Sequence, residues 1–524
     1  MSLSREAYRS LEDIVGPENI SEEPAVLDGY CFVRGNELHF DNRYATMPPA
    51  VILPGSTEEV QAIVKVCNRF RIKYKAHSSG WDFAALSSRE PFLPLDMRRM
   101  DRILEIDIKN KYAVVEPYVS VQKLMVETFK RGLRPHTVGC GPSAGILASS
   151  TSHFGCGPTS ISADYAGRVP LGVEWVLPDG EILRVGSLCM DSWFSGDGPG
   201  PSLRGIMRGI SGANGGLGVI TKTAVRLNPW YGPQSIPGKG KPNIYGCDIP
   251  PCFANYFVVF PSRQQLTDFF LLLVEEAIAH GAQRNSASVV AMITTESNDE
   301  FWSLVKDSPP EMRDSLRFSA TVMLDASSTR EMGYRKKCFE AILKKVEGQA
   351  IPMDARTESA VFFNSLTCQG TQRIFRLSGS FLSAVAIQES WDACMGGGKK
   401  ASEDLYDKYE KLGLVADSGE SPWASAFVDN CGHIECVVIF DQFDKKSVEA
   451  VREILAEADQ KLPEWHLAMG AFEGALTFEE RAQKAAAPYC LDFLNFEKKI
   501  KKLFDPNLVS ESSAYVSIKG DLTT

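Results

Sequence analysis

Three short loops built from small residues could bind phosphate groups. They span residues 77–80, 139–150 and 215–218, in a chain whose 42 glycines are crowded between Gly132 and Gly218. Backbone N–H groups in such loops can converge on an anion because no side chain obstructs them. Neither the Gly-x-Gly-x-x-Gly fingerprint at a strand–helix junction nor a P-loop is present, which argues against an ordinary NAD domain and a P-loop enzyme. Taken singly, each loop is better explained as a plain turn.

The elements that would position these loops alternate between short strands and helices. Ser56 and Glu59 form a capping box in front of a helix that buries one face, and a strand is expected over residues 72–76. A strand over 113–115 precedes a helix capped by Ser120, and residues 172–185 are typical of a hairpin. A helix near 203–210 and a strand over 219–227 follow.

The second half of the chain has a different composition. Residues 232–251 are rich in Gly, Pro and Lys and are expected to form a linker. Beyond it we expect a strand over 256–260, an amphipathic helix over 266–280 and a glycine-rich loop at 396–398.

Composition excludes several function classes. The chain has 524 residues and a net charge of −10, with no basic block, which argues against nucleic-acid binding. The longest apolar run, 269–274, is too short for a membrane span, and the first residues show no signal region, so a cytoplasmic protein is expected.

Cysteine and histidine usage argues against a metal centre. None of the 13 cysteines forms a Cys-x-x-Cys pair, and the seven histidines are not clustered, so no metal site is predicted. Cys140, Cys156, Cys431 and Cys436 allow a redox interpretation, but without basic neighbours they are better explained as small buried apolar residues.

Collinear motifs make the chain similar to a known family. They occupy residues 48–60, 77–81, 95–100, 113–117, 172–181 and 216–222, with weaker matches at 432–438 and 504–507. Together they resemble the flavin domain of the vanillyl-alcohol oxidase and 4-cresol dehydrogenase family. The same domain serves glycolate and D-lactate dehydrogenases and alkyl-dihydroxyacetone-phosphate synthase.

The resemblance implies an α+β fold. It consists of an FAD-binding domain of two α/β subdomains (PCMH type) and an α+β cap domain built on an antiparallel sheet. The expected boundaries are 1–235 for the FAD-binding domain (core 47–229), 236–480 for the cap or substrate domain, and 481–524 for a C-terminal segment that returns to the FAD domain.

The resemblance also implies FAD as the cofactor and places residues of all three loops along it. The residues it assigns to the cofactor are His77, Ser78, Ser79, Gly80, Trp81, Pro142, Ser143, Gly145, Ile146, Ser149, Gly218, Val219 and Ile220. Trp81 replaces the usual covalent histidine, which favours non-covalent FAD. A covalent link through His433 is the alternative.

Two residues are candidates for catalysis beside the flavin. Asp164 lies near a position where the family can carry a flavin-facing acid, and a desolvated carboxylate could act as base or acid; the alternative is a surface or capping aspartate. His433 lies in an alternating segment typical of a strand, and a buried structural histidine is its alternative interpretation.

The chain departs from the family pattern at three places. The first argues against a phenolic substrate, the second against a metal-assisted 2-hydroxy-acid site, and the third concerns the cofactor. Residues 465–472 lack the Tyr-Arg pair that binds phenolate, only His433 remains of the metal-binding histidines of the 2-hydroxy-acid branch, and Tyr118 replaces a glycine near the cofactor.

The resulting prediction is an FAD-dependent oxidoreductase. It would move a hydride from an alcohol or activated C–H carbon, including an aromatic one, to flavin N5, with re-oxidation by oxygen or a protein acceptor. A D-2-hydroxy-acid dehydrogenase with Arg373 or Arg376 as carboxylate ligand is one alternative, and a non-catalytic flavin-binding subunit of an electron-transfer complex is another. The expected partners are a small-molecule substrate, a protein electron acceptor and a second copy of the chain in a homodimer.

Overall fold

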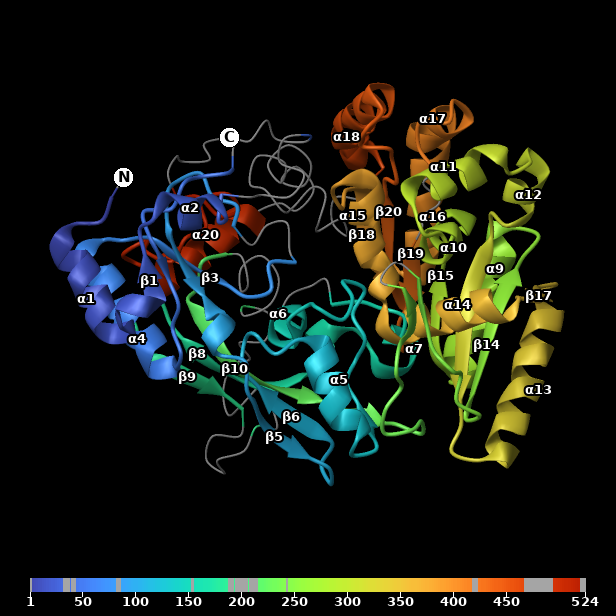
Figure 1. Cartoon of the computed structure of the whole chain (residues 1–524), viewed down its shortest axis with the longest axis horizontal. Coiled ribbons are helices and arrows are strands. Elements are labelled where there is room, and N and C mark those ends of the chain that lie inside the picture. Colours follow the sequence, from blue (N-terminus) through green and yellow to red (C-terminus); the bar gives the residue numbers. More distant parts are fainter. Residues whose placement is uncertain are drawn as a thin grey trace.

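A computed structural model gives the fold of the chain (Figure 1). It describes residues 2–31, 38, 44–81, 86–151, 155–186, 193, 206, 215–241, 244–416, 423–465 and 493–518. A four-stranded and a five-stranded sheet lie in the N-terminal half, and a seven-stranded sheet lies in residues 253–465, which we call the cap. The expected helix at 203–210 falls almost entirely outside the described residues.

The first sheet of the N-terminal half is mixed. Its strands, in order, are β1 (Ile20–Ser21), β2 (Val51–Ile52), β4 (Leu93–Asp96) and β3 (Tyr74–His77). Helices α1 (Arg5–Val15) and α4 (Thr57–Phe70) pack on it through a shared apolar core. The hydroxyl of Ser56 accepts the N–H of Glu59 over 3.2 Å, which confirms the predicted helix start. The Glu59 carboxylate bonds the N–H of Gly55 over 2.7 Å.

The second sheet is antiparallel throughout. Its order is β5 (Ile103–Asp107), β6 (Tyr112–Val115), β10 (Val219–Arg226), β8 (Pro170–Val176) and β9 (Ile182–Val185). The pairing of β8 with β9 confirms the predicted hairpin. Helix α5 (Val121–Phe129) begins after Ser120, whose hydroxyl accepts the N–H of Lys123.

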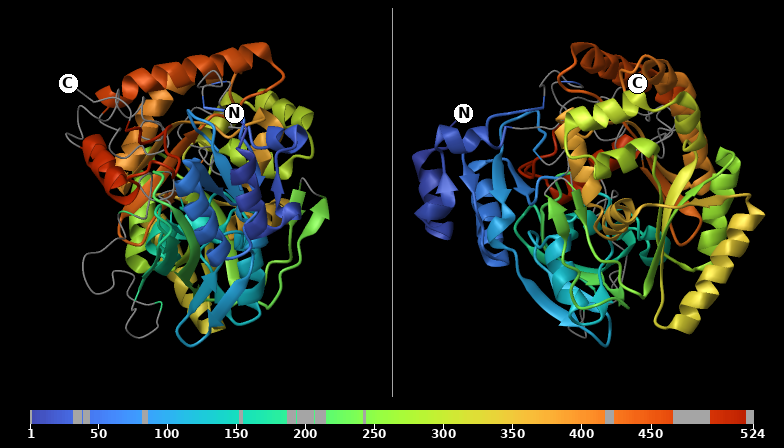
Figure 2. Two further views of the ribbon diagram at one scale, coloured as in Figure 1. Left: turned by 90° about the vertical axis from the view of Figure 1, so that its left-hand side faces the viewer. Right: turned by 45° about the vertical axis from the view of Figure 1, so that its right-hand side comes forward.

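The cap is built on a seven-stranded antiparallel sheet, as expected. Its order is β17 (Gln349–Ile351), β14 (Phe253–Val259), β16 (Ser319–Asp325), β15 (Ala279–Arg284), β19 (Trp423–Ala426), β20 (Cys431–Val437) and β18 (Ser383–Ser390). One apolar core joins this sheet to α9 (Arg263–Glu276), α13 (Thr329–Lys345), α16 (Trp391–Ala401) and α18 (Lys445–Glu464). Helix α18 runs across the top of the molecule (Figure 2). The α+β fold class is therefore confirmed.

Two expectations for the cap were wrong. The helix over 266–280 ends at Glu276, because Ala277 is left-handed and His280 belongs to β15. The glycines at 396–398 are not a loop but part of α16. A Cβ atom on Gly398 would lie 2.6 Å from the side chain of Ile434, so the absence of a side chain at Gly398 lets α16 approach β20 closely. The expected linker at 232–251 also contains a short hairpin, β12 (Lys239–Lys241) with β13 (Ile244–Gly246).

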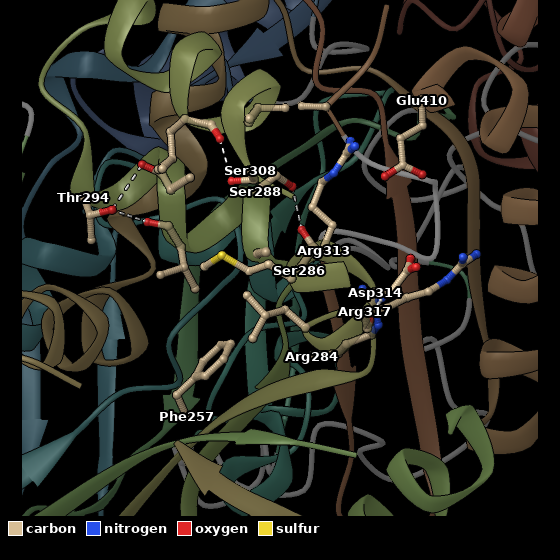
Figure 3. A pocket seen from close by; sticks show the side chains of 18 residues that line it. Phe257, Arg284, Ser286, Ser288, Thr294, Ser308, Arg313, Asp314, Arg317 and Glu410 are labelled. Carbon is tan, nitrogen blue, oxygen red and sulfur yellow. Dashed lines mark hydrogen bonds between the residues drawn. The ribbon is translucent and has the colours of Figure 1, made fainter. Parts of the chain in front are cut away.

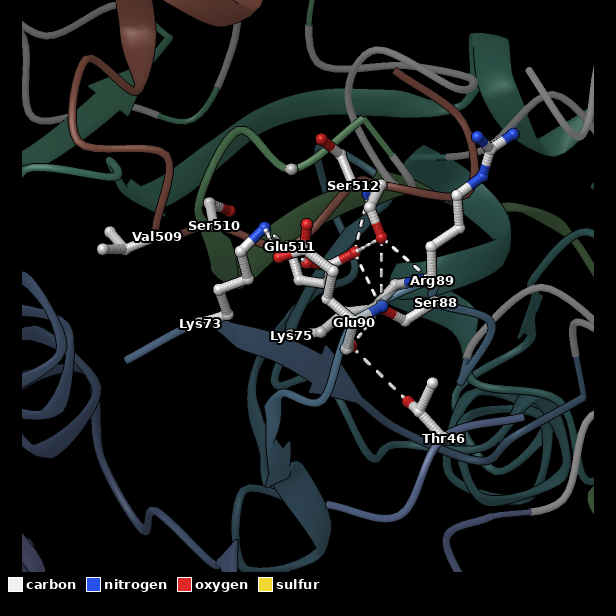
Figure 4. Close-up of polar contacts among 12 residues, drawn as sticks. Thr46, Lys73, Lys75, Ser88, Arg89, Glu90, Val509, Ser510, Glu511 and Ser512 are labelled. Atoms are coloured by element: carbon white, nitrogen blue, oxygen red, sulfur yellow. Dashed lines mark hydrogen bonds and ion pairs between the residues drawn. The ribbon is translucent and has the colours of Figure 1, made fainter. Parts of the chain in front are cut away.

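The C-terminal segment lies against the N-terminal half. Helix α20 (Phe493–Phe504) is followed by residues whose backbone pairs with β3, where Glu511 donates its N–H to the carbonyl of Tyr74. Figure 4 shows Glu511 beside Lys73 and Ser88; its carboxylate accepts the Ser88 hydroxyl over 2.8 Å. The segment is therefore fastened to the sheet that leads into loop 77–80.

All cysteines within the described residues are free thiols. None of the described helices combines the length and apolar composition that a bilayer crossing requires.

Candidate active site

Loops 77–80 and 139–150 meet although they are far apart in sequence. The N–H of Gly145 donates to the hydroxyl of Ser79 over 3.0 Å. A Cβ atom on Gly145 would lie 3.1 Å from the Pro117 carbonyl oxygen and 3.5 Å from the Ser78 hydroxyl. Glycine is therefore the residue that lets this backbone approach the serine loop.

The joined loops present groups suited to a polar ligand. Ser79 and Gly80 are exposed, and Gly80 has a φ of +69°, which favours glycine. Nearby, His77 Nδ1 and the Ser150 hydroxyl are buried and have no hydrogen-bond partner among the described residues. Burial lowers the pKa of His77, so its ring is neutral at pH 7.

Other predicted cofactor residues lie along the same loop. Pro142 accepts the N–H of Gln122 through its carbonyl, Ile146 is buried, and Ser149 is nearly buried at the start of helix α6 (Ile146–Thr151). Ser143 is exposed and accepts a hydrogen bond from Gln372 of the cap. Loop 139–150 therefore also touches the cap.

Trp81 continues this contact with the cap. Its ring packs edge-on against Phe375, with 5.5 Å between ring centroids, and lies 6.0 Å from Phe381. Phe375 belongs to helix α15 (Ile374–Ser378). Trp81, which directly follows loop 77–80, thus packs against the cap.

Other segments of the chain pack closely against loop 215–218. The N–H of Gly218 donates to the Ser510 hydroxyl over 3.0 Å, and a Cβ atom there would lie 2.2 Å from the Val176 carbonyl oxygen. Val219 and Ile220 begin β10 and pair with β8, and the Val219 side chain is buried in the core beside the first sheet. The Val219 side chain is therefore not available for a cofactor contact, and only its backbone groups remain candidates.

The cap presents a polar surface toward the N-terminal half. Gly432 and Ile434 lie against α16 and the cap core, so the alternating residues His433 and Glu435 point the other way. Gln388 and Ser425 flank His433 on the neighbouring strands. We call Gln388, Ser425, His433 and Glu435 the polar cap face.

The polar cap face contacts residues 156 and 157. The hydroxyl of Ser425 donates to the Gly157 carbonyl over 3.0 Å, and the Cys156 thiol lies 3.8 Å from the Gln388 side-chain oxygen. Loops 77–80 and 139–150 and the polar cap face are thus parts of one contact region between the two halves.

A histidine and a carboxylate are paired on this face. His433 Nε2 lies 3.5 Å from Glu435 Oε1, and both side chains are largely buried. Such a pair can hold or transfer a proton. Glu435 was not predicted, although the alternation recognised over 430–437 already places residues 433 and 435 on one side of a strand.

Asp164 lies at another part of the same region. It follows helix α7 (Ser160–Ala163) with a φ of +67°, and its carboxylate accepts the N–H of Tyr165 over 2.9 Å. Arg168 lies 3.5 Å from it and also pairs with Asp429 at the β19–β20 turn. Burial raises the pKa of Asp164, and the Tyr165 bond and the Arg168 charge offset part of this effect.

The two cap arginines considered as carboxylate ligands hold the end of one helix. Arg373 donates to the Ile293 carbonyl over 2.5 Å and Arg376 to the Thr295 carbonyl over 2.8 Å, both at the end of helix α10 (Ala287–Thr294). Arg373 Nη2 is buried and has no hydrogen-bond partner among the described residues.

Two further sequence features concern the phenolate-binding pair and a metal site. Residues 466–472, where the phenolate-binding pair was sought, lie outside the described residues. In the part of the chain that is described, no three His, Cys, Asp or Glu side chains group as a metal site would require.

Comparison with known proteins identifies the domain that carries the loops. Residues 48–186 match the FAD binding domain family. Glycolate oxidase subunit GlcD of Bacillus subtilis is 24% identical over 96% of this chain and 95% of its own length. The flavoprotein subunit of 4-cresol dehydrogenase from Pseudomonas putida is 27% identical, but over 43% of this chain and 42% of its own length.

Solved structures share the fold of the whole chain. p-Cresol methylhydroxylase superposes with a TM-score of 0.70 at 17% identity, covering 97% of this chain and 96% of the other. 4-Ethylphenol oxidase from Gulosibacter chungangensis gives 0.69 at 19% identity, covering 98% of both chains.

The loops that meet at Gly145 fit the cofactor of this family. The close approach at Gly145, the exposed Ser79 and Gly80, and the buried His77 and Ser150 atoms without described partners suit a ligand with several polar groups. Residues 48–186 therefore form an FAD binding domain, and the chain is similar to FAD-dependent oxidoreductases that include the glycolate oxidase subunit and the flavoprotein subunit of 4-cresol dehydrogenase.

Proposed function

We propose that this enzyme oxidises a small molecule at an alcohol or another activated C–H carbon, on the polar cap face. The observation that carries the proposal is the buried His433–Glu435 pair, because it gives this face a group that can take up a proton. Bound FAD supplies the two-electron acceptor for the C–H bond.

In this proposal the chain's own residues bind and orient the substrate. His433 takes the proton of the substrate hydroxyl, and Glu435 orients the imidazole and stabilises its charged form. Gln388 and Ser425 flank His433 and bound the space in which the reacting carbon is held.

Asp164 is the second candidate acid or base. Its raised pKa suits proton transfer near neutral pH better than that of an exposed aspartate. Its position beside Arg168 and the β19–β20 turn supports a role at the edge of the same region.

We propose that loop 77–80 holds the pyrophosphate of FAD and that residues 142–149 lie along the cofactor. Ser78, Ser79 and Gly80 supply small side chains and accessible backbone. Gly218, Val219 and Ile220 contribute through backbone groups alone, since the Val219 side chain packs into the core. FAD is bound non-covalently in this proposal; a bond through His433 is the alternative.

A D-2-hydroxy-acid dehydrogenase is the second candidate function. The similarity to a glycolate oxidase subunit over nearly the whole chain favours it. Arg373, whose Nη2 has no hydrogen-bond partner among the described residues, is the candidate ligand for the substrate carboxylate.

We propose that the electrons leave to oxygen or to a protein acceptor, and that the enzyme is a cytoplasmic homodimer. Similarity to subunits of multi-subunit enzymes supports a protein acceptor. Light scattering on the purified holoprotein tests the dimer directly.

The test of function is anaerobic mixing of the holoprotein with a panel of 4-hydroxybenzyl alcohol, an aliphatic primary alcohol, glycolate and D-lactate. We expect at least one of them to bleach the oxidised flavin spectrum. Bleaching only by the 2-hydroxy acids, with loss in Arg373→Gln, would select the second candidate. An oxidised flavin with every compound would overturn both.

A further inference from the structure

A cavity lies in the cap, away from the polar cap face (Figure 3). It encloses about 240 Å³ between helices α10, α11 (Asn298–Asp307) and α12 (Pro310–Ser315), at the end of β15. No residue of the polar cap face lines it. The cavity is therefore separate from the proposed active site.

The walls of the cavity are mainly aliphatic. Val290 and Ala291 come from α10, and Leu304 and Val305 come from α11. Leu304 and Met312 are 46% and 52% exposed, so two large apolar side chains remain in contact with solvent where they border the cavity. Exposed apolar side chains gathered at an opening are typical of a binding site for an apolar group.

The hydroxyl groups that line the cavity are bonded within the protein. Ser308 donates to the Leu304 carbonyl over 2.6 Å, and Thr294 donates to the Val290 carbonyl over 2.8 Å. These two hydroxyl hydrogens are thus directed at the chain's own backbone, and the hydroxyl groups of Ser286 and Ser288 bond each other over 2.7 Å.

The charged side chains of the lining are three arginines and two carboxylates. Arg284, Arg313 and Arg317 line the cavity together with Asp314 and Glu410. Arg317 also contacts Ser402 and Asp407. Arg313, from α12, has a buried Nε atom with no hydrogen-bond partner among the described residues.

From this lining we infer that the cap holds a second ligand site for an aliphatic monocarboxylate. Its hydrocarbon chain lies between α10 and α11, and its carboxylate is bound by Arg313 beside the opening. An apolar cavity whose lining includes an arginine N–H with no hydrogen-bond partner among the described residues is complementary to this class of molecule.

Octanoate is the probe, titrated into the FAD-loaded holoprotein by calorimetry. We expect one octanoate per chain, with an unchanged flavin spectrum, and binding that persists in His433→Gln. Ala291→Trp fills the cavity and should abolish binding. Arg313→Gln should weaken it about tenfold, the effect expected for one charged hydrogen bond. Lys306→Gln, which removes an exposed charge of α11 outside the cavity, should leave it unchanged.

1-Octanol distinguishes the head group from the chain and should bind at least tenfold more weakly than octanoate. Equal affinity for both molecules, or full affinity of folded Ala291→Trp, would overturn the proposal. Binding that perturbs the flavin spectrum and is lost in His433→Gln would place octanoate in the active site and would also overturn it. Because bleaching of the flavin is a separate readout, failure here leaves the proposed oxidation intact.

Discussion

The N–H of Gly145 donates a hydrogen bond to the hydroxyl of Ser79, and this bond joins two loops that are 66 residues apart. The bond fixes the small-residue loop after β3 against the loop that leads into α6. Both loops lie along FAD in the proposed binding mode, so the geometry between Ser79 and Gly145 would set the shape of the proposed cofactor site.

A methyl group at position 145 should weaken FAD binding. In Gly145→Ala the new Cβ atom would lie 3.1 Å from the Pro117 carbonyl oxygen, so loop 139–150 is expected to shift by a few tenths of an ångström away from Pro117. We expect at least a tenfold rise in the dissociation constant of FAD, measured by fluorescence titration of the apoprotein. Gly333→Ala, in α13 with no atom within 4 Å of the added carbon, is the control and should bind FAD normally.

The pH dependence of flavin bleaching should respond to Arg168. Burial raises the pKa of Asp164, and the Arg168 charge holds that rise back. If Asp164 acts as a base, Arg168→Gln shifts the acidic limb of the rate profile to higher pH, and Asp164→Asn removes that limb. A limb that stays in place in Arg168→Gln, at unchanged FAD content, would exclude Asp164 from proton transfer.

Lys501 should be essential for the attachment of the C-terminal segment. Its buried ammonium donates to the carboxylate of Asp505 and the carbonyl of Gly216, each over 2.6 Å. Lys501→Met leaves Asp505 as an uncompensated buried charge and should cost about 3–5 kcal/mol of unfolding free energy. Urea unfolding measures this loss. Lys502→Met, at the exposed neighbouring position, should change stability little; equal stability of the two variants would contradict the assignment.

The free energy of unfolding should fall in acid because the Asp325 carboxylate becomes protonated. Burial alone would raise the pKa of Asp325, but His280, Arg134 and Arg335 outweigh it and lower the pKa to about 2. A lowered pKa stabilises the folded state above the unfolded value near 4, and this contribution is lost as pH falls toward 2. It amounts to about 2 kcal/mol, on the conversion of pKa shifts into free energy.

Asp325→Asn isolates this contribution. The variant should be less stable than the wild type at pH 6, and the difference should shrink as the pH is lowered to 3. Asp248→Asn removes an exposed carboxylate paired only with Lys239 among the described residues, and it should leave the pH dependence of stability unchanged. A constant Asp325→Asn difference across this pH range would contradict the linkage.

Local patterns predicted the helices and strands of the N-terminal half well because their start and turn signals lie within a few residues of each element. The Ser56 cap and the turn after Val176 each depend on neighbours in sequence, and both are present. Small residues marked the three candidate loops in the sequence, and the assignment of these loops to FAD came from the family resemblance and stays a prediction.

Elements that depend on distant partners could not be predicted in this way. Three successive glycines at 396–398 indicate a loop by propensity, yet they lie within helix α16, where Gly398 packs against Ile434 of the distant strand β20. His280 continues an apolar helical pattern in sequence, but pairing with β16 places it in a strand. The partners of Gly216 and Gly218, more than 280 residues away, give no signal in the sequence of the loop itself.

The His433–Glu435 pair is tested most directly by the rate at which substrate bleaches the flavin under anaerobic conditions. Wild type, His433→Gln and Glu435→Gln are compared at equal FAD content, with the compound that bleaches the wild type fastest. We predict a loss of about 10²- to 10⁴-fold in His433→Gln, the range expected for a general acid or base, and a smaller loss with an altered pH profile in Glu435→Gln. Bleaching of His433→Gln at the wild-type rate would contradict the proposed role of the polar cap face.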